Sequence, residues 1–303
     1  MSATTSTRTG TDTGADARPS RNIRPSRSSR SVRAPRNVIG GIFGWIWLAV
    51  IILPIYYILV TSLRKQSSFY SENPLLPPAE PTLESYGTVL TNGFPLYFLN
   101  SLIVTIVSVG VVLVVCVMAA YYVVRSRTPW ARRTFSVFLL GLAIPLQATI
   151  IPVYYMITQL RLYDTLIALI LPSIAFAIPI TILILVNFLR DIPNELFESM
   201  RMDGTGDWGM LWHLVVPLAK PAIVTVAIYD ALNVWNGFLF PLVLTQSANT
   251  RVLPLSLWTF QGEFTINIPA VLAAVTLSAL PIIVLYIVGR RQLISGLTAG
   301  FGK

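Results

Sequence analysis

The sequence "RDIPNELFESMRMDGTGDWGMLWHLVVPLAKP", residues Arg190 to Pro221, lies between two long apolar segments and holds the only histidine of the chain. Asp191 and Pro193 signal the start of a helix, and Gly204 permits a turn after it. Four apolar residues then recur at helical spacing, in a stripe that Pro217 is expected to end: Trp208, Leu211, Trp212 and Val215. The stretch therefore predicts a helix-turn-helix with one apolar face, suited to a groove on a partner protein. The alternative is a helix that lies in the headgroup plane of a membrane.

The composition of the chain is that of an integral membrane protein. Of its 303 residues, 54% are hydrophobic and only 12% are charged, which is too few polar groups to cover a surface in water. A helix needs about 20 mostly apolar residues to cross a bilayer. Six segments meet this requirement: Val38 to Leu63, Phe98 to Val124, Phe135 to Leu160, Leu166 to Leu189, Ile223 to Leu244, and Pro269 to Val288. The sequence predicts an all-α polytopic fold with six transmembrane helices, and a cytoplasmic helix-turn-helix between spans four and five.

Several of the six segments contain proline, which membrane helices tolerate where neighbouring helices satisfy the freed carbonyl groups. We interpret each of these prolines as a simple kink: Pro54, Pro145, Pro152, Pro172, Pro179, Pro241 and Pro281.

The distribution of lysine and arginine predicts the orientation. With the N-terminus in the cytoplasm, 18 of the 22 basic residues fall in cytoplasmic segments and four fall outside. Cytoplasmic segments of membrane proteins are enriched in Lys and Arg, so both termini are expected in the cytoplasm. The net charge of +9 reflects this bias, and no nucleic-acid partner is expected.

The chain is expected to have four parts. Residues 1–37 are rich in Ser, Thr, Arg and Gly and predict a disordered, basic cytoplasmic tail. Residues 38–97 comprise the first span and a long Pro-rich outer loop, which ends in a short amphipathic helix from Leu83 to Leu90 and is long enough to be a docking surface. Residues 98–289 form the transmembrane core, and residues 290–303 form a cytoplasmic C-terminal tail.

The motifs of enzymes and cofactor sites are missing from the sequence. The single cysteine, Cys116, lies within a span, so neither an intrachain disulfide nor a thiolate metal site is expected. The closing "GLTAGFGK" departs from the spacing of a phosphate-binding loop and ends without the Ser or Thr that follows its lysine. We therefore expect no catalytic residues, no metal site and no bound cofactor.

The fifth span is the polar one. Its "IYDALNVWNGF" places Asp230, Asn233 and Asn236 at successive steps of three residues, roughly along one side of a helix, beside Trp235. A carboxylate at bilayer depth costs about 3 kcal/mol, so it normally faces a bundle interior or a wet cavity. These four residues are candidates to line a substrate path, where they would offer sugar hydroxyls hydrogen-bonding groups and an aromatic face. The alternative is that they join helices by hydrogen bonds.

The opening stretch resembles the EAA loop of ABC-importer permeases, by which a permease couples to its ATPase subunit. The resemblance rests on Glu198-Ser199-Met200, on Asp203-Gly204, and on Pro217 after a spacer. Three later segments are similar to the maltose-type carbohydrate permeases, specifically to the shorter six-span partner of a permease pair: "WNGFLFPLVL", "LPLSLWTFQGEF" and "GLTAGFGK". Through the resemblance, the candidate ATPase-coupling residues are Glu198, Ser199, Asp203, Gly204, Trp208, Leu211, Trp212 and Pro217.

The resemblance implies a set of partners and a location. It implies a second permease subunit, two ATPase subunits that bind the ATP, an extracytoplasmic solute-binding protein, and a surrounding lipid membrane at the cell surface. The transported solute would be a carbohydrate, a di- or oligosaccharide, moved inward by alternating access; a glycerol phosphate is an alternative. An ion-coupled secondary transporter is a further alternative, but such proteins use buried titratable relays, and Asp230 is the one carboxylate well inside a predicted span.

Overall fold

A computed structural model describes residues 38–126, 128–260 and 266–299. The predicted tail at residues 1–37 lies outside them, as do parts of two quoted motifs at residues 261–265 and 300–303. The regular structure of the described residues is helical, as predicted. Its α-helices are α1 (Val38–Ser62), α2 (Glu84–Thr91), α3 (Phe94–Arg125), α4 (Pro129–Leu140), α5 (Leu146–Gln159), α6 (Leu166–Arg190), α7 (Asn194–Met202), α8 (Asp207–Met210), α9 (Val216–Trp235), α10 (Leu239–Leu244), α11 (Leu253–Ser256) and α12 (Ile268–Ala299).

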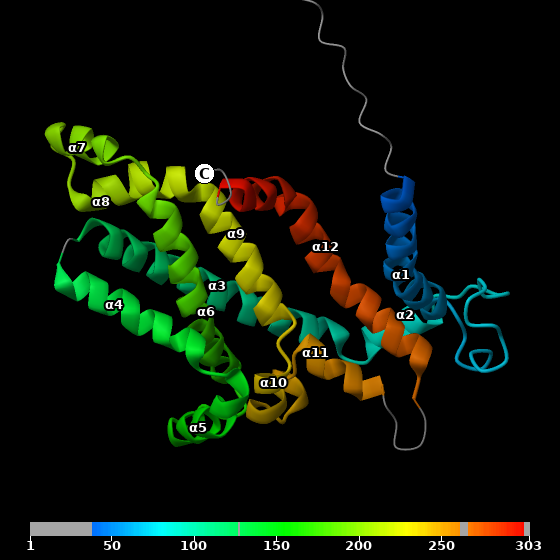
Figure 1. Ribbon diagram of the computed structural model, residues 1–303. Helices are drawn as coiled ribbons and strands as arrows, with labels where there is room; N and C mark the ends of the chain where they lie inside the picture. Colours follow the sequence, from blue (N-terminus) through cyan, green and yellow to red (C-terminus); the bar gives the residue numbers. More distant parts are fainter. Residues whose placement is uncertain (1–37, 127, 261–265, 300–303) are drawn as a thin grey trace, which may run out of the picture. The chain divides into compact units, whose positions relative to one another are not determined.

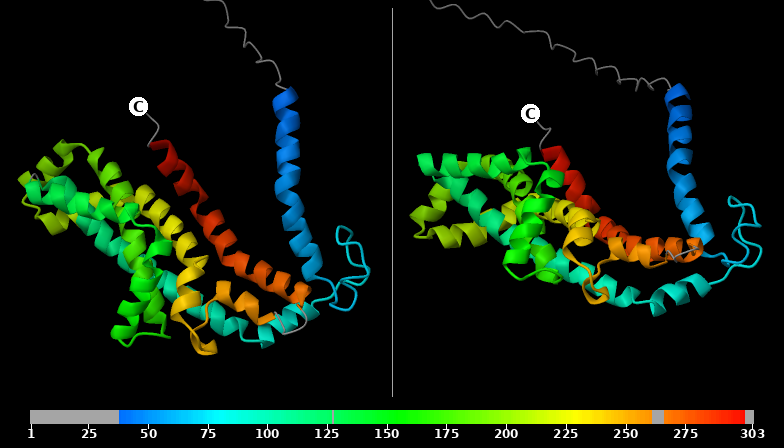
Figure 2. Two further views of the ribbon diagram at one scale, coloured as in Figure 1. Left: turned by 60° about the horizontal axis from the view of Figure 1, so that its bottom comes forward. Right: turned by 90° about the horizontal axis from the view of Figure 1, so that it is seen from below.

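The chain divides into two units, residues 1–48 and 49–303. The described part of the first unit is the start of α1, where Trp45 and Trp47 are exposed. In the second unit α3, α6 and α9 pack on one another, and α12 packs along α9 (Figures 1 and 2). Helix α4 lies against α6, and α10 lies against α5. This arrangement leaves the buried core of the second unit between α3, α6 and α9.

Five helices among the described residues are long and apolar enough to cross a membrane. Four of the predicted spans correspond to single long helices: α1, α3, α6 and α12. The short helix predicted at Leu83 to Leu90 is present as α2. The third and fifth predicted spans differ from the prediction.

The third predicted span, Phe135 to Leu160, is not one straight helix. It is made by α4 with a short 3₁₀ turn and by α5, which are bent by 104° at the break between them. Pro145 stands at this break, so its interpretation as a simple kink was wrong. Ile144 is extended, with φ −88° and ψ 112°, a conformation that the ring of a following proline favours over the helical one. The pair is a broken span or a re-entrant segment, and a sixth crossing exists only if it counts as one span.

The fifth predicted span, Ile223 to Leu244, begins earlier and ends earlier than expected. Helix α9 ends at Trp235, and α10 is a separate short helix. Pro217 was expected to end the helix before it, but α8 runs through a π-helical turn at Leu211–Val215 directly into α9. A π-turn interrupts the α-helical hydrogen-bond pattern, and Pro217 is the second residue of α9, directly after this interruption. The helix-turn-helix is therefore a short helix, a turn, and the beginning of a long span.

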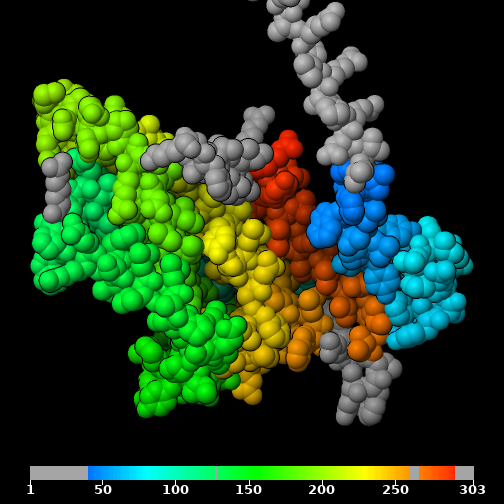
Figure 3. Space-filling model, viewed as in Figure 1, coloured from blue at the N-terminus to red at the C-terminus, as the bar shows by residue number. Residues whose placement is uncertain are grey.

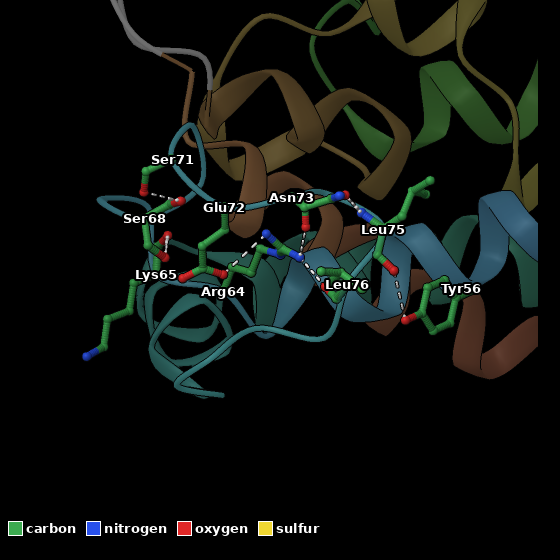
Figure 4. A network of polar contacts seen from close by, with 9 residues as sticks. All are labelled: Tyr56, Arg64, Lys65, Ser68, Ser71, Glu72, Asn73, Leu75 and Leu76. Atoms are coloured by element: carbon green, nitrogen blue, oxygen red, sulfur yellow. Dashed lines mark hydrogen bonds and ion pairs between the residues drawn. The ribbon is translucent and has the colours of Figure 1, made fainter.

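The loop after α1 is folded around one buried side chain, Arg64 (Figure 4). Its guanidinium donates to the backbone oxygen of Asn73 over 2.7 Å and to that of Leu76, and lies 3.3 Å from a carboxylate oxygen of Glu72. The backbone N–H of Thr82 closes the loop by donating to the oxygen of Leu63 over 2.9 Å. Hydrogen bonds and an ion pair thus hold the loop in its fold, and the buried Arg64 side chain makes most of them.

The orientation of the spans is a prediction that fusion reporters test. Because of the strong basic bias, reporters fused after Arg133, Lys220 or Lys303 should report cytoplasm, whereas those at residues 70–90 or 245–265 should report the outside. Enzymatic reporters active on only one side of the membrane give the readout. A cytoplasmic signal from residue 80 would contradict the orientation.

Candidate functional site

The segment that resembles the coupling loop projects from one end of the second unit. Helices α7 and α8 (yellow-green) lie at the surface there (Figures 1 and 3). Gly204 makes the turn between them with φ +80°, in the left-handed region that glycine enters without strain. The N–H groups of Gly204 and Thr205 donate to the oxygens of Arg201 and Met200, over 3.1 and 3.0 Å. These bonds satisfy the last carbonyls of α7, as in many helix ends that turn on a glycine.

Buried residues anchor this segment to the transmembrane helices. Phe197 of α7, Met210 of α8 and Leu211 of the π-turn are at most 3% exposed and join the core between α3 and α6. Arg125, at the end of α3, lies 4.1 Å from the centre of the Phe197 ring and donates to the side-chain oxygen of Asn194 over 2.9 Å. These contacts attach α7 and α8 to α3 and α6.

The predicted apolar stripe is divided between two faces. Trp208 and Trp212 are 62% and 56% exposed, whereas Leu211 and Val215 are buried in the core. Residues four apart share a helix face, so the two tryptophans form one surface and the two aliphatic residues another. The expectation of a single stripe was therefore wrong.

Seven of the eight candidate coupling residues are on the surface. Leu211 is the buried one; the others are exposed, namely Glu198, Ser199, Asp203, Gly204, Trp208, Trp212 and Pro217. Met202, which the sequence analysis did not select, is 84% exposed beside them in the chain.

A cavity of about 380 Å³ lies among the helices of the second unit, lined by residues of α3, α5, α6, α9, α10 and the start of α11. This volume is within the range of small-molecule sites, about 300 to 1,000 Å³. Its polar lining comes from Ser101, Ser173, Tyr229, Asp230 and Asn233. Its aromatic lining comes from Phe176, Phe238, Phe240 and Trp235. Hydroxyl and carboxylate groups beside aromatic rings are suited to a polar solute with apolar faces.

The four candidate substrate-path residues have different surroundings in the structure. Asp230 is 1% exposed and accepts a 2.7 Å hydrogen bond from the hydroxyl of Thr181 on α6. Asn233 is exposed, lines the cavity and donates to the oxygen of Tyr229 in its own helix. Trp235 is buried, and its N–H donates to the oxygen of Ser278 on α12 over 3.2 Å. Asn236 donates to Leu232 in its own helix and is not among the residues that line the cavity.

Several buried polar residues near the candidate site had no signal in the sequence. Thr181 lies 49 residues from Asp230, and a threonine in an apolar helix is unremarkable until the packing is known. The expectation that only the fifth span is polar was also incomplete. Helix α3 buries four polar side chains along its length: Asn100, Ser101, Thr105 and Ser108.

Comparisons with known proteins identify the family of the chain. Residues 113–293 match the family of binding-protein-dependent transport system inner membrane components. A putative ABC transporter permease of a Caldicellulosiruptor strain is 39% identical over 86% of this chain and 95% of its own length. The diacetylchitobiose uptake system permease protein NgcG of Streptomyces coelicolor is 30% identical over 84% of this chain and 85% of its own.

A solved structure shares the fold. A chain of a bacterial ABC transporter involved in the import of the acidic polysaccharide alginate superposes with a TM-score of 0.76, at 23% identity, over 84% of this chain and 95% of that one. The family is one of transporters, so the chain has a transport role and is not an enzyme. The chain belongs to the family of binding-protein-dependent transport system inner membrane components, the permease subunits of ABC importers.

Proposed function

We propose that this chain is one permease subunit of an ATP-driven importer that moves a di- or oligosaccharide into the cytoplasm. The observation that carries the proposal is similarity along most of the chain to permeases whose names specify sugar uptake, such as the diacetylchitobiose permease. The alginate importer, which has the same fold, is consistent with it. The cavity lining of hydroxyl, carboxamide, carboxylate and aromatic groups suits a carbohydrate.

The chain would supply half of a pore. A second permease subunit would complete the path, two ATPase subunits would bind ATP and close on it, and an extracytoplasmic solute-binding protein would deliver the sugar. The exposed surface of α7, α8 and the π-turn after it, with Glu198, Trp208 and Trp212, would enter an ATPase groove. Phe197 and Arg125 would then carry the movement of that surface to α3 and α6, which line the cavity.

An ion-coupled transporter is the second candidate, because Asp230 is a buried carboxylate within a span. Such a mechanism needs a relay of titratable groups. In the described structure Asp230 bonds to a threonine hydroxyl, which does not titrate. Sugar import by an ABC permease is therefore favoured.

Uptake in cells tests the proposed function. A strain that lacks this chain should lose accumulation of one or more labelled di- or oligosaccharides, and the cloned chain should restore it. Labelled glycerol phosphate and an amino acid belong in the same panel. Loss of glycerol phosphate uptake alone would show that the substrate is a glycerol phosphate and not a sugar. Undiminished uptake of every sugar would overturn the proposal.

The role of the cavity residues is tested by Asp230→Ala and Asn233→Ala. If both side chains line the sugar path, uptake should fall by about tenfold, the scale of one lost hydrogen bond of about 1.4 kcal/mol, while the amount of assembled complex is kept. If they join helices instead, the amount of complex should fall. Thr225→Val is the matched control, since Thr225 bonds to Pro221 in its own helix and does not line the cavity. Uptake per assembled complex separates the two outcomes.

A further inference from the structure

The connection between α10 and α11, residues 245–252, joins two parts of the cavity wall. Phe240 and Pro241 line the cavity before the connection, and Val252 and Pro254 line it at and just after its end. The position of the connection therefore determines where the lining residues before it and after it are placed in the cavity wall.

A single carboxylate holds this connection. Asp164 lies between α5 and α6, and its Oδ1 accepts hydrogen bonds from the N–H of Gln246 over 2.8 Å, the N–H of Ser247 over 3.0 Å and the hydroxyl of Thr250 over 2.6 Å. Its own N–H donates to the oxygen of Leu244 over 2.9 Å. Asp164 has φ +60°, a conformation that Asp and Asn adopt more readily than other side chains. We call these four hydrogen bonds the Asp164 clip.

The Asp164 clip is formed by an ionised carboxylate. Partial burial raises the pKa of Asp164, but the hydrogen bonds from Gln246, Thr250 and Ser247 outweigh it and lower the pKa to about 2. Because the pKa of Asp164 is lower in the folded than in the unfolded chain, its carboxylate stabilises the fold at pH values above about 4, the unfolded pKa. This stabilisation is lost as the pH falls through about 2. Between pH 5 and 8 the clip therefore stays charged, and hydrogen bonds to a charged acceptor are the stronger kind.

A second attachment comes from α3. The side-chain nitrogen of Asn100 donates to the oxygens of Asn249 and Arg251, over 2.8 and 2.9 Å. The hydroxyl of Ser101 accepts from the N–H of Leu253 over 2.8 Å. Asn100 and Ser101 are buried, and Ser101 also lines the cavity. The connection is thus fixed on one side to the α5–α6 corner and on the other to α3.

We propose that Asp164 is a positioning residue for transport, which holds the 245–252 connection and α10 against the α5–α6 corner so that this part of the cavity wall moves as one body. The proposal rests on the proposed function, because the cavity is taken as the sugar path. Asp164 is not among the residues that line the cavity. Its effect on sugar is therefore exerted through Phe240, Pro241, Val252 and Pro254.

Two substitutions at the same position test the proposal in the complete complex, purified with its partner permease, ATPases and binding protein. Asp164→Gly removes the acceptor but keeps the left-handed backbone free of strain. Asp164→Asn keeps an Oδ1 acceptor and also tolerates that backbone. The readout is the amount of sugar moved into proteoliposomes per ATP hydrolysed. Asp164→Gly should lower this ratio by about tenfold, since displacement of a binding wall by about 1 Å is costly, and Asp164→Asn should restore most of it.

Amide hydrogen exchange on the same samples gives a second readout that needs no sugar. The amides of Gln246 and Ser247 should exchange faster in Asp164→Gly than in the parent and in Asp164→Asn. An unchanged exchange rate in Asp164→Gly would overturn the proposal. It would also be overturned if the amount of complex fell while the sugar moved per ATP hydrolysed stayed unchanged. If the parent complex moves no sugar at all, the proposed function fails, and the exchange rates still decide whether the clip holds the connection.

Discussion

Glu198→Lys and Gly204→Val are each expected to abolish sugar uptake while the chain still inserts into the membrane in the normal amount. Both positions are exposed on the surface of α7 and its following turn, and neither contributes to a membrane-spanning helix. Glu198→Lys reverses the charge that the proposed ATPase groove would meet. Gly204→Val forces a β-branched residue to φ +80°, which costs about 1 to 3 kcal/mol and shifts the turn. The space around Gly204 is open, so backbone strain is the cause of the effect and not a clash.

The chain contains a matched control for Gly204→Val. Gly206 lies in the same turn and also has open space around it, but its φ is −76°, which any residue adopts. Gly206→Val should therefore retain most uptake. Co-purification of the ATPase subunits, together with ATP hydrolysis stimulated by the binding protein, should fall in Glu198→Lys and Gly204→Val. If both variants bind the ATPase and transport like the parent, the segment is an interfacial helix and the coupling role is wrong.

Arg64→Met is expected to have the second large effect, a loss of the folded loop after α1 and with it of functional complex. The substitution leaves the backbone oxygens of Asn73 and Leu76 without their donor and Glu72 without its cation. Arg64 is fully buried, and hydrogen bonds to a charged group contribute about 1.5 to 3 kcal/mol each. Arg64→Lys should rescue only in part, since one ammonium does not reproduce the planar fork of a guanidinium. Limited proteolysis of membranes should cut the loop at residues 64–82 in Arg64→Met and leave the parent intact.

The neighbouring residue provides the control for Arg64. Lys65 forms an ion pair with Glu80 at 2.5 Å, but the two side chains are 43% and 76% exposed, and exposed pairs contribute little to stability. Lys65→Met should therefore leave the loop resistant to protease and uptake near the parent level. Equal sensitivity of the Lys65 and Arg64 variants would show that charge in the loop matters and burial does not.

The spans that the sequence predicted well are those whose apolar residues are continuous. Helices α1, α3, α6 and α12 follow from length and composition alone, because a bilayer imposes both. Two of the errors fall at proline, at Pro145 and Pro217, and a third is the break between α9 and α10 at residues 236–238. Whether a proline kinks a helix, ends it or lies at its first turn depends on the neighbours that satisfy the freed carbonyl groups. Pro145 marks a 104° break, whereas Pro172 and Pro179 lie within one helix, α6.

The candidate coupling segment was accessible from sequence because its turn, its helix start and its spacing are local. The division of its apolar stripe between two faces could not be predicted from the sequence. The burial of Leu211 and the exposure of Trp212 depend on where α3 and α6 pack. The partner of Asp230 and the Asp164 clip join positions 49 to 86 residues apart. A single sequence does not identify such pairs, because several other polar residues of the chain could equally well be the hydrogen-bond partner.

The most direct test of the central claim is sugar uptake by proteoliposomes that contain the purified chain with its partner permease and ATPase subunits. Labelled sugar should accumulate only when the binding protein is supplied on one side and ATP on the other, and dissipation of ion gradients by ionophores should leave the rate unchanged. Accumulation that proceeds without ATP and collapses when ionophores are added would contradict the account, and would assign the chain to ion-coupled transport.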